Sequence, residues 1–62
     1  MDMEKILAEY DAMFGVNSPS EILSYLVQKA DMARERHDAA ALLILLNETI
    51  WYLFPIFRFV RV

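Results

Sequence analysis

The histidine and its acidic neighbours come closest to a set of residues that could bind a metal or act as a general base. His37 lies near Asp31, Glu35 and Asp38 in the sequence. A zinc site needs three or four convergent ligands, and acid–base catalysis needs a second placed group, whereas this cluster falls at an expected helix end. The chain also has no cysteine, so it has neither thiolate ligands nor disulfides. We therefore expect a solvated turn histidine, and no catalytic residue, metal site or cofactor.

A second polar group interrupts an otherwise apolar segment, residues 39–54. Asn47 and Glu48 lie near its middle. As structural residues, they would lie on a narrow exposed strip or form hydrogen bonds to a neighbouring helix, because unpaired polar groups are costly to bury. As functional residues, they would bind a ligand in a groove. We favour the structural interpretation.

Aromatic residues are concentrated towards the end of the sequence. Five of the eight lie within nine positions, namely Trp51, Tyr52, Phe54, Phe57 and Phe59. Such a cluster can fill the chain's own core or anchor a contact with a partner. For the partner contact, we predict the residues Leu43, Leu46, Ile50, Trp51, Phe54, Phe57 and Phe59.

The elements that position these residues are predicted to be three helices, over residues 2–14, 19–36 and 39–54. Ser18, Pro19 and Glu21 have the spacing of a capping box with proline at the first helical position. Gly15 can take the left-handed conformation that closes the first helix, and Asp38 can cap the third. In the second helix, one apolar face is predicted to comprise Ile22, Leu23, Leu26, Val27, Ala30 and Ala33.

The third helix differs from the other two because it is apolar nearly all round. Such a helix is usually covered on more than one side. The chain has 62 residues, of which 58% are hydrophobic, and a chain this short buries only about 60% of its surface. Part of the apolar surplus is therefore expected to face another chain, a partner or lipid.

Charge excludes one class of partner. Residues 1–38 carry eight acids and four bases, residues 39–62 carry one acid and two bases, and the net charge is -3. Binding to a phosphate backbone needs clustered lysine or arginine, which this acidic chain lacks. We therefore expect no nucleic-acid binding.

The spacing of residues 22–52 resembles a tetratricopeptide repeat, in which two antiparallel helices are joined by a tight turn. The resemblance rests on Ala30 and Ala33, on His37-Asp38, on Leu42 and on Leu46 to Ile50, and residues 36–50 look like the turn and second helix of such a repeat. The sequence departs from the usual pattern at several positions. His37 stands where these repeats usually have glycine, Leu42 and Thr49 replace alanines, and Pro55 lies about one residue past the usual proline.

This resemblance implies an all-α fold of three helices, with a TPR-like antiparallel hairpin preceded by an N-terminal helix. It also implies a scaffold for protein or peptide binding, without cofactor or catalysis. About three repeats are needed for a stable stack, so the chain is either a piece of a longer array or completes its core by self-association. We predict one helical domain over residues 1–54 and a hydrophobic extension over 55–62. The expected partner is a second copy in a homo-oligomer, for which a dimer is favoured, or another protein.

Two alternative functions remain open from the sequence. Residues 39–62 could insert into a membrane, although Glu48 would then lie near its centre, where a carboxylate is costly. The chain could also be a small inhibitor that docks on a host protein. The acidic N-terminus lacks the basic start of a secretory signal, so a cytoplasmic location is expected.

Overall fold

The computed structural model describes residues 1–54 and shows three helices. They are α1 (Met3–Met13), α2 (Pro19–Glu35) and α3 (Ala39–Leu53), and the described part of the chain contains no strand. The predicted all-α fold of three helices is confirmed, and each predicted helix end lies within one residue of the observed end.

Each helix begins at a residue whose side chain accepts a hydrogen bond from the first turn. Asp2 accepts from the backbone N–H of Lys5 at 3.2 Å, and Asp38 accepts from that of Ala41 at 3.1 Å. Ser18 forms the predicted capping box with Glu21, because Ser18 Oγ accepts from the Glu21 N–H at 3.3 Å and Glu21 Oε1 accepts from the Ser18 N–H at 2.9 Å. These bonds satisfy donors that a helix start leaves without partners.

The first two helices are each followed by a residue with left-handed backbone. Gly15, with φ 77°, follows α1 as predicted. After α2 this conformation falls on His37, with φ 55°. The N–H of Asp38 donates to the carbonyl of Ala33 at 2.9 Å, and the N–H of His37 donates to that of Arg34 at 3.1 Å. This pair of bonds is a Schellman motif, in which the left-handed position is usually glycine.

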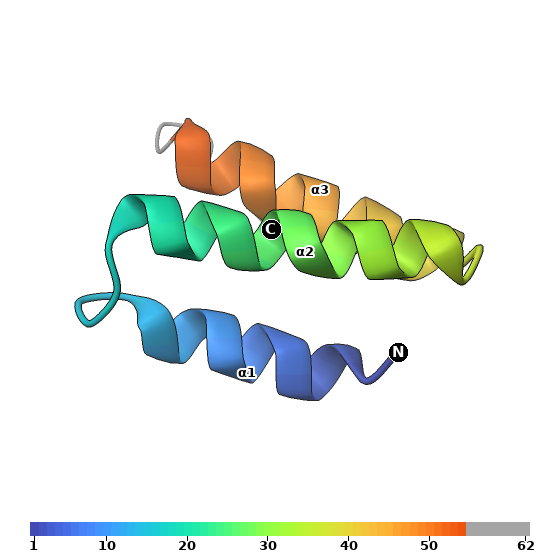
Figure 1. The fold of residues 1–62 in the computed structure, drawn as a ribbon, viewed down its shortest axis with the longest axis horizontal. Helices are drawn as coiled ribbons and strands as arrows, with labels where there is room; N and C mark the ends of the chain where they lie inside the picture. The colour runs from blue at the N-terminus through green and yellow to red at the C-terminus, as the bar shows by residue number, and fades with distance from the viewer. Residues whose placement is uncertain (55–62) are drawn as a thin grey trace.

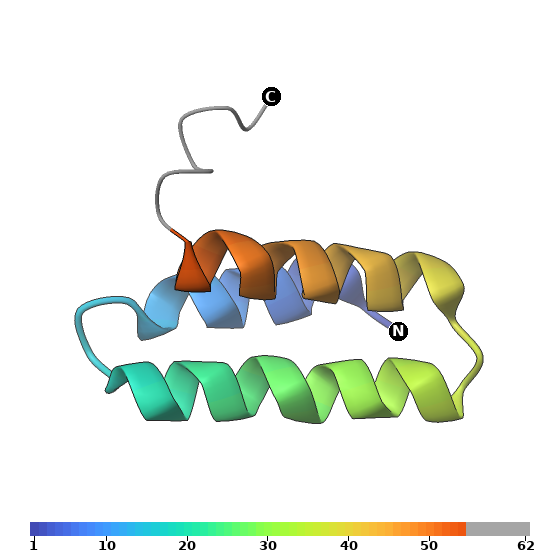
Figure 2. The ribbon, with the colours of Figure 1, turned by 90° about the horizontal axis from the view of Figure 1, so that it is seen from above.

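The three helices run up, down and up, so neighbours in sequence are antiparallel (Figures 1 and 2). Helix α2 packs more extensively against α3 than against α1. Helices α1 and α3 run in the same direction. The amino nitrogen of Met1 lies 3.6 Å from Asp38 Oδ2 at one end, and the rings of Phe14 and Tyr52 lie 5.7 Å apart at the other.

Within residues 1–54, the core lies between the three helices and is formed by seven buried side chains. They are Ile6, Tyr10, Ile22, Leu26, Ala33, Ala41 and Leu45. The small Ala33 and Ala41 lie on either side of the α2–α3 turn, where they allow the two helices to approach closely. Val27 was predicted to share the apolar face of α2, but its side chain is 54% exposed and lies outside the core.

An exposed apolar face as the candidate functional site

Helix α3 has a buried side and an exposed side, and both are rich in apolar residues. The buried side contains Ala41, Leu45, Glu48 and the half-buried Tyr52, at steps of three and four residues. These steps place the four side chains on one face, which packs against the other helices. Residues 1–54 thus cover α3 on this face, and the expected cover of a further side by another chain, a partner or lipid stays a prediction.

The opposite side of α3 forms a continuous exposed stripe, which we call the α3 face. Its members also recur at helical spacing and are Leu43, Leu46, Asn47, Ile50, Leu53 and Phe54. The five apolar side chains are 65%, 46%, 46%, 51% and 53% exposed, in sequence order. Scattered exposed apolar residues are normal on a protein surface, but a contiguous row of this kind is typical of an interaction site.

Four of the seven predicted contact residues lie on the α3 face. They are Leu43, Leu46, Ile50 and Phe54. Trp51 is half-buried at the edge of the stripe. Phe57 and Phe59 lie outside the described residues, so their predicted role remains a prediction.

Two members of the face, Leu53 and Asn47, were not among the predicted contacts. Leu53 lies three residues after Ile50, and Asn47 lies four residues after Leu43. Their helical spacing from these two predicted contact residues therefore would have placed both on the same face. The predicted contact residues were instead selected by residue type, which favoured large aromatic side chains over Leu53 and Asn47.

The polar residues Asn47 and Glu48 are neighbours in the sequence but lie on opposite sides of α3. Asn47 is exposed on the α3 face, whereas Glu48 is 5% exposed and lies on the buried side. In the described part of the chain, every buried side-chain nitrogen or oxygen has a hydrogen-bond partner. Asn47 thus lies on an exposed strip, as the structural interpretation predicted, whereas Glu48 is buried.

The α3 face carries no ionisable side chain. Within α3 the one charged residue is Glu48, which lies on the buried side. The other charged residues of the described chain lie on α1, on α2, at their ends or, for Asp38, at the N-cap of α3, off the α3 face. The α3 face is therefore an uncharged strip on an acidic protein.

The histidine cluster does not form a site in the structure. His37 is exposed, and its backbone forms the turn between α2 and α3. Asp31 forms an ion pair with Arg34 at 3.5 Å, between two exposed side chains. Within residues 1–54, no group of three or more histidine, aspartate or glutamate side chains could hold a metal ion.

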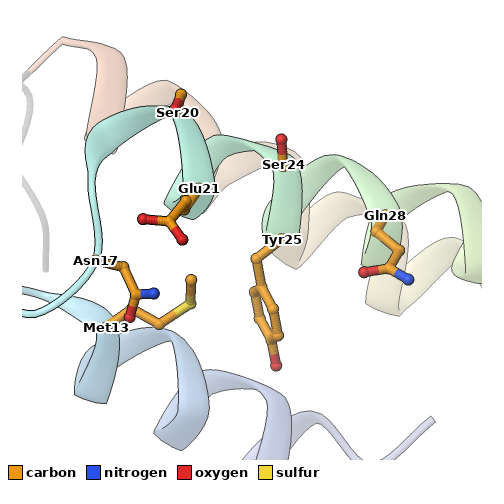
Figure 3. A pocket seen from close by; sticks show the side chains of 7 residues that line it. All are labelled: Met13, Asn17, Ser20, Glu21, Ser24, Tyr25 and Gln28. Atoms are coloured by element: carbon orange, nitrogen blue, oxygen red, sulfur yellow. The ribbon is translucent and has the colours of Figure 1, made fainter.

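A polar depression of about 350 Å³ lies between α1 and the first half of α2 (Figure 3). Its lining consists of Met13, Asn17, Ser20, Glu21, Ser24, Tyr25 and Gln28. The carboxylate of Glu21 is already engaged in the capping box, and the hydrogen bonds from Ser18 lower its pKa. The lining contains no lysine, arginine or histidine.

Tyr25 extends from this depression towards α1 (Figure 3). Its hydroxyl donates to Glu9 Oε2 at 2.7 Å and to the carbonyl of Ile6 at 3.4 Å. Burial and, to a lesser degree, the Glu9 carboxylate raise the pKa of Tyr25 to about 12. The Tyr25 hydroxyl therefore links α2 to α1 beside the depression.

Within the described residues, no helix combines the length and the apolar character needed to cross a membrane.

Comparisons with known proteins give no relative for this chain. No protein-family model matches it, and neither a curated protein nor a solved structure matches it at a significant level.

Proposed function

We propose that this chain is a non-enzymatic interaction module that self-associates through the α3 face. The observation that carries this proposal is the row of five large apolar side chains, each between 46% and 65% exposed, on one side of α3. A row of this kind is costly to leave in water and is self-complementary, because two copies can cover each other with the same surface.

The size of the face agrees with a weak dimer. The exposed fractions of its five apolar residues together amount to about two and a half fully exposed large side chains. At roughly 1.5–3 kcal/mol for each side chain, covering the face on both copies contributes about 8–16 kcal/mol. Association costs about 4–15 kcal/mol in lost freedom of motion. The two ranges overlap, so we expect a dimer whose population depends on concentration.

Charge favours this surface over the others for contact between two copies. The chain carries nine acids and six Lys or Arg residues, so two copies repel each other. An approach through the α3 face brings together surfaces without ionisable groups and keeps the charged helices α1 and α2 away from the contact. This argument supports a second copy as the partner.

The α2–α3 hairpin also supports the proposal that the chain is a protein interaction module. Its two antiparallel helices are joined by residues 36–38, an arrangement that the tetratricopeptide resemblance implies. In such repeats a single hairpin leaves faces that neighbouring units cover. A second copy would supply this cover here, in the cytoplasmic location that we propose for the chain.

The test is the mass of the purified chain in detergent-free buffer, measured by light scattering after size exclusion at several concentrations. We expect a dimer that dissociates on dilution, and a monomer for the double variant Leu43→Ser/Ile50→Ser. Both positions are exposed, so the fold of the variant should be retained, which circular dichroism would check.

The matched control is Val27→Ser, which removes an apolar side chain that is 54% exposed but lies on α2. This variant should dimerise like the parent chain. A parent chain that stays monomeric at all concentrations, or a double variant with unchanged mass, would contradict the proposal. Solubility only in detergent would instead support the membrane alternative.

A further inference from the structure

A single polar residue lies in the middle of the α3 face. Asn47 is preceded by Leu43 and Leu46 and followed by Ile50 and Phe54 on the same stripe. Its side chain is exposed, and within residues 1–54 its amide makes no hydrogen bond. The nearby Thr49, which lies off the stripe, donates its hydroxyl to the carbonyl of Leu45 at 2.8 Å.

Covering the α3 face would remove the Asn47 amide from water. An amide has both donors and acceptors, and burying them without partners is unfavourable. The surrounding members of the face are apolar and supply no partner. If a second copy covers the face with its own α3 face, the polar side chain that it brings is its own Asn47.

The two-fold symmetry of a dimer then determines which residue of the α3 face lies beside the symmetry axis. In a two-fold dimer, a residue faces itself only where it lies beside the symmetry axis. Two amides in this position can each donate to and accept from the other, so both are satisfied. A shift of one helix along the other would place each Asn47 against leucine, isoleucine or phenylalanine and leave both amides without partners.

We infer that Asn47 lies beside the two-fold axis of the dimer and pairs with Asn47 of the second copy, as a positioning residue that fixes the register of the two α3 helices. This inference rests on the proposed self-association and adds the location of the axis. A polar residue within an apolar helix contact is a known means of specifying register.

Cross-linking tests the location directly, because the chain has no cysteine of its own. The variant Asn47→Cys places one thiol on each copy, and a disulfide forms only where two Cβ atoms approach to about 3.5–4.5 Å. Under mild oxidation we expect a covalent dimer for Asn47→Cys. The control Gln28→Cys places an exposed thiol on α2, away from the α3 face, and should remain without a covalent link at the same concentration.

A charge substitution tests the same location without a covalent bond. Asn47→Asp places two carboxylates against each other, which is strongly unfavourable at an interface. We expect the dissociation constant of the dimer to rise about 100-fold or more at pH 7. The control Gln28→Glu adds the same charge to each copy at an exposed position on α2 and should change the constant by less than about threefold.

The possible failures can be distinguished. A parent chain that is monomeric contradicts the proposed function itself. A parent dimer in which Asn47→Cys does not cross-link more than Gln28→Cys, or in which Asn47→Asp dimerises as well as Gln28→Glu, overturns the position of Asn47 and leaves self-association intact. Support for the inference requires both the cross-link and the loss of affinity.

Discussion

Replacing His37 with glycine should stabilise the protein. His37 holds the left-handed position of the Schellman motif between α2 and α3, with φ 55°. A side chain with a Cβ atom is unfavourable there by about 1–2 kcal/mol, because Cβ crowds the following carbonyl oxygen. Glycine avoids this crowding, but it also makes the unfolded chain more flexible, which costs about 0.4–1 kcal/mol. Taken at the middle of each range, the net gain expected for His37→Gly is about 0.8 kcal/mol.

The variant Gly15→Ala makes the converse change, because it adds a Cβ atom at the other left-handed position. Gly15 has φ 77°, and a Cβ atom added there would meet no atom within 4 Å. Any loss of stability in Gly15→Ala therefore reflects backbone strain and not a steric clash with a neighbour. We expect this variant to lose about 1 kcal/mol.

The assay is urea and thermal unfolding followed by circular dichroism, at one fixed protein concentration because self-association would contribute to stability. For a domain of this size, a gain of about 0.8 kcal/mol raises the midpoint temperature by roughly 3–6 °C. His37→Ala serves as the control, since it removes the imidazole and keeps the Cβ atom. If His37→Gly is no more stable than His37→Ala, the Cβ atom at position 37 does not destabilise the left-handed backbone. That result would refute the proposed origin of the stability gain.

Two further predictions concern the hydrogen bonds at α2. Ser18→Ala removes the cap of α2 and should cost about 1 kcal/mol in urea unfolding, whereas Ser24→Ala, at an exposed position within the helix, should not be destabilising. Because the bonds from Ser18 lower the pKa of Glu21 from 4.5, their contribution is present above that value and is lost as the pH falls through the lowered pKa. The largest of these effects comes from the Ser18 backbone N–H, so the matched variant is Glu21→Gln, which removes the titrating carboxyl. A parent chain and a Glu21→Gln variant with the same acid dependence would contradict this assignment. Tyr25, with a pKa raised from 10.0 to about 12, should ionise late in a titration followed by ultraviolet absorbance, and stability should fall as the pH rises between these values. Glu9→Gln should lower the pKa of Tyr25, and an unchanged titration would show that Glu9 has no influence on it.

The local features of the fold could be predicted from single residues. The capping box of Ser18, the left-handed Gly15 and the Asp38 cap each depend on neighbours within a few positions of the sequence. Such signals need no knowledge of the tertiary structure. They gave helix ends within one residue of those observed.

The orientation of α3 could not be predicted in this way. Leu43 and Leu45 are the same residue type two positions apart, yet one is 65% exposed and the other is fully buried. A helix that is apolar all round has no polar side to mark its outside, so its periodicity does not identify the buried face. Glu48 would have suggested the wrong answer, because a carboxylate is usually exposed and this one lies on the buried side. The exposed side of α3 therefore depends on how α1 and α2 pack against it, which the sequence pattern of α3 does not contain.

The unequal packing of α2 against its two neighbours has a consequence for how the molecule opens and folds. Helices α2 and α3 share the larger contact and are joined by the short connection of residues 36–38, whereas α1 packs less extensively on α2. Contacts across a short connection cost little chain entropy to close, so the hairpin can form early in folding. Helix α1 is then the part that detaches at the lowest free energy, and its backbone amides exchange with solvent hydrogen before those of α2 and α3.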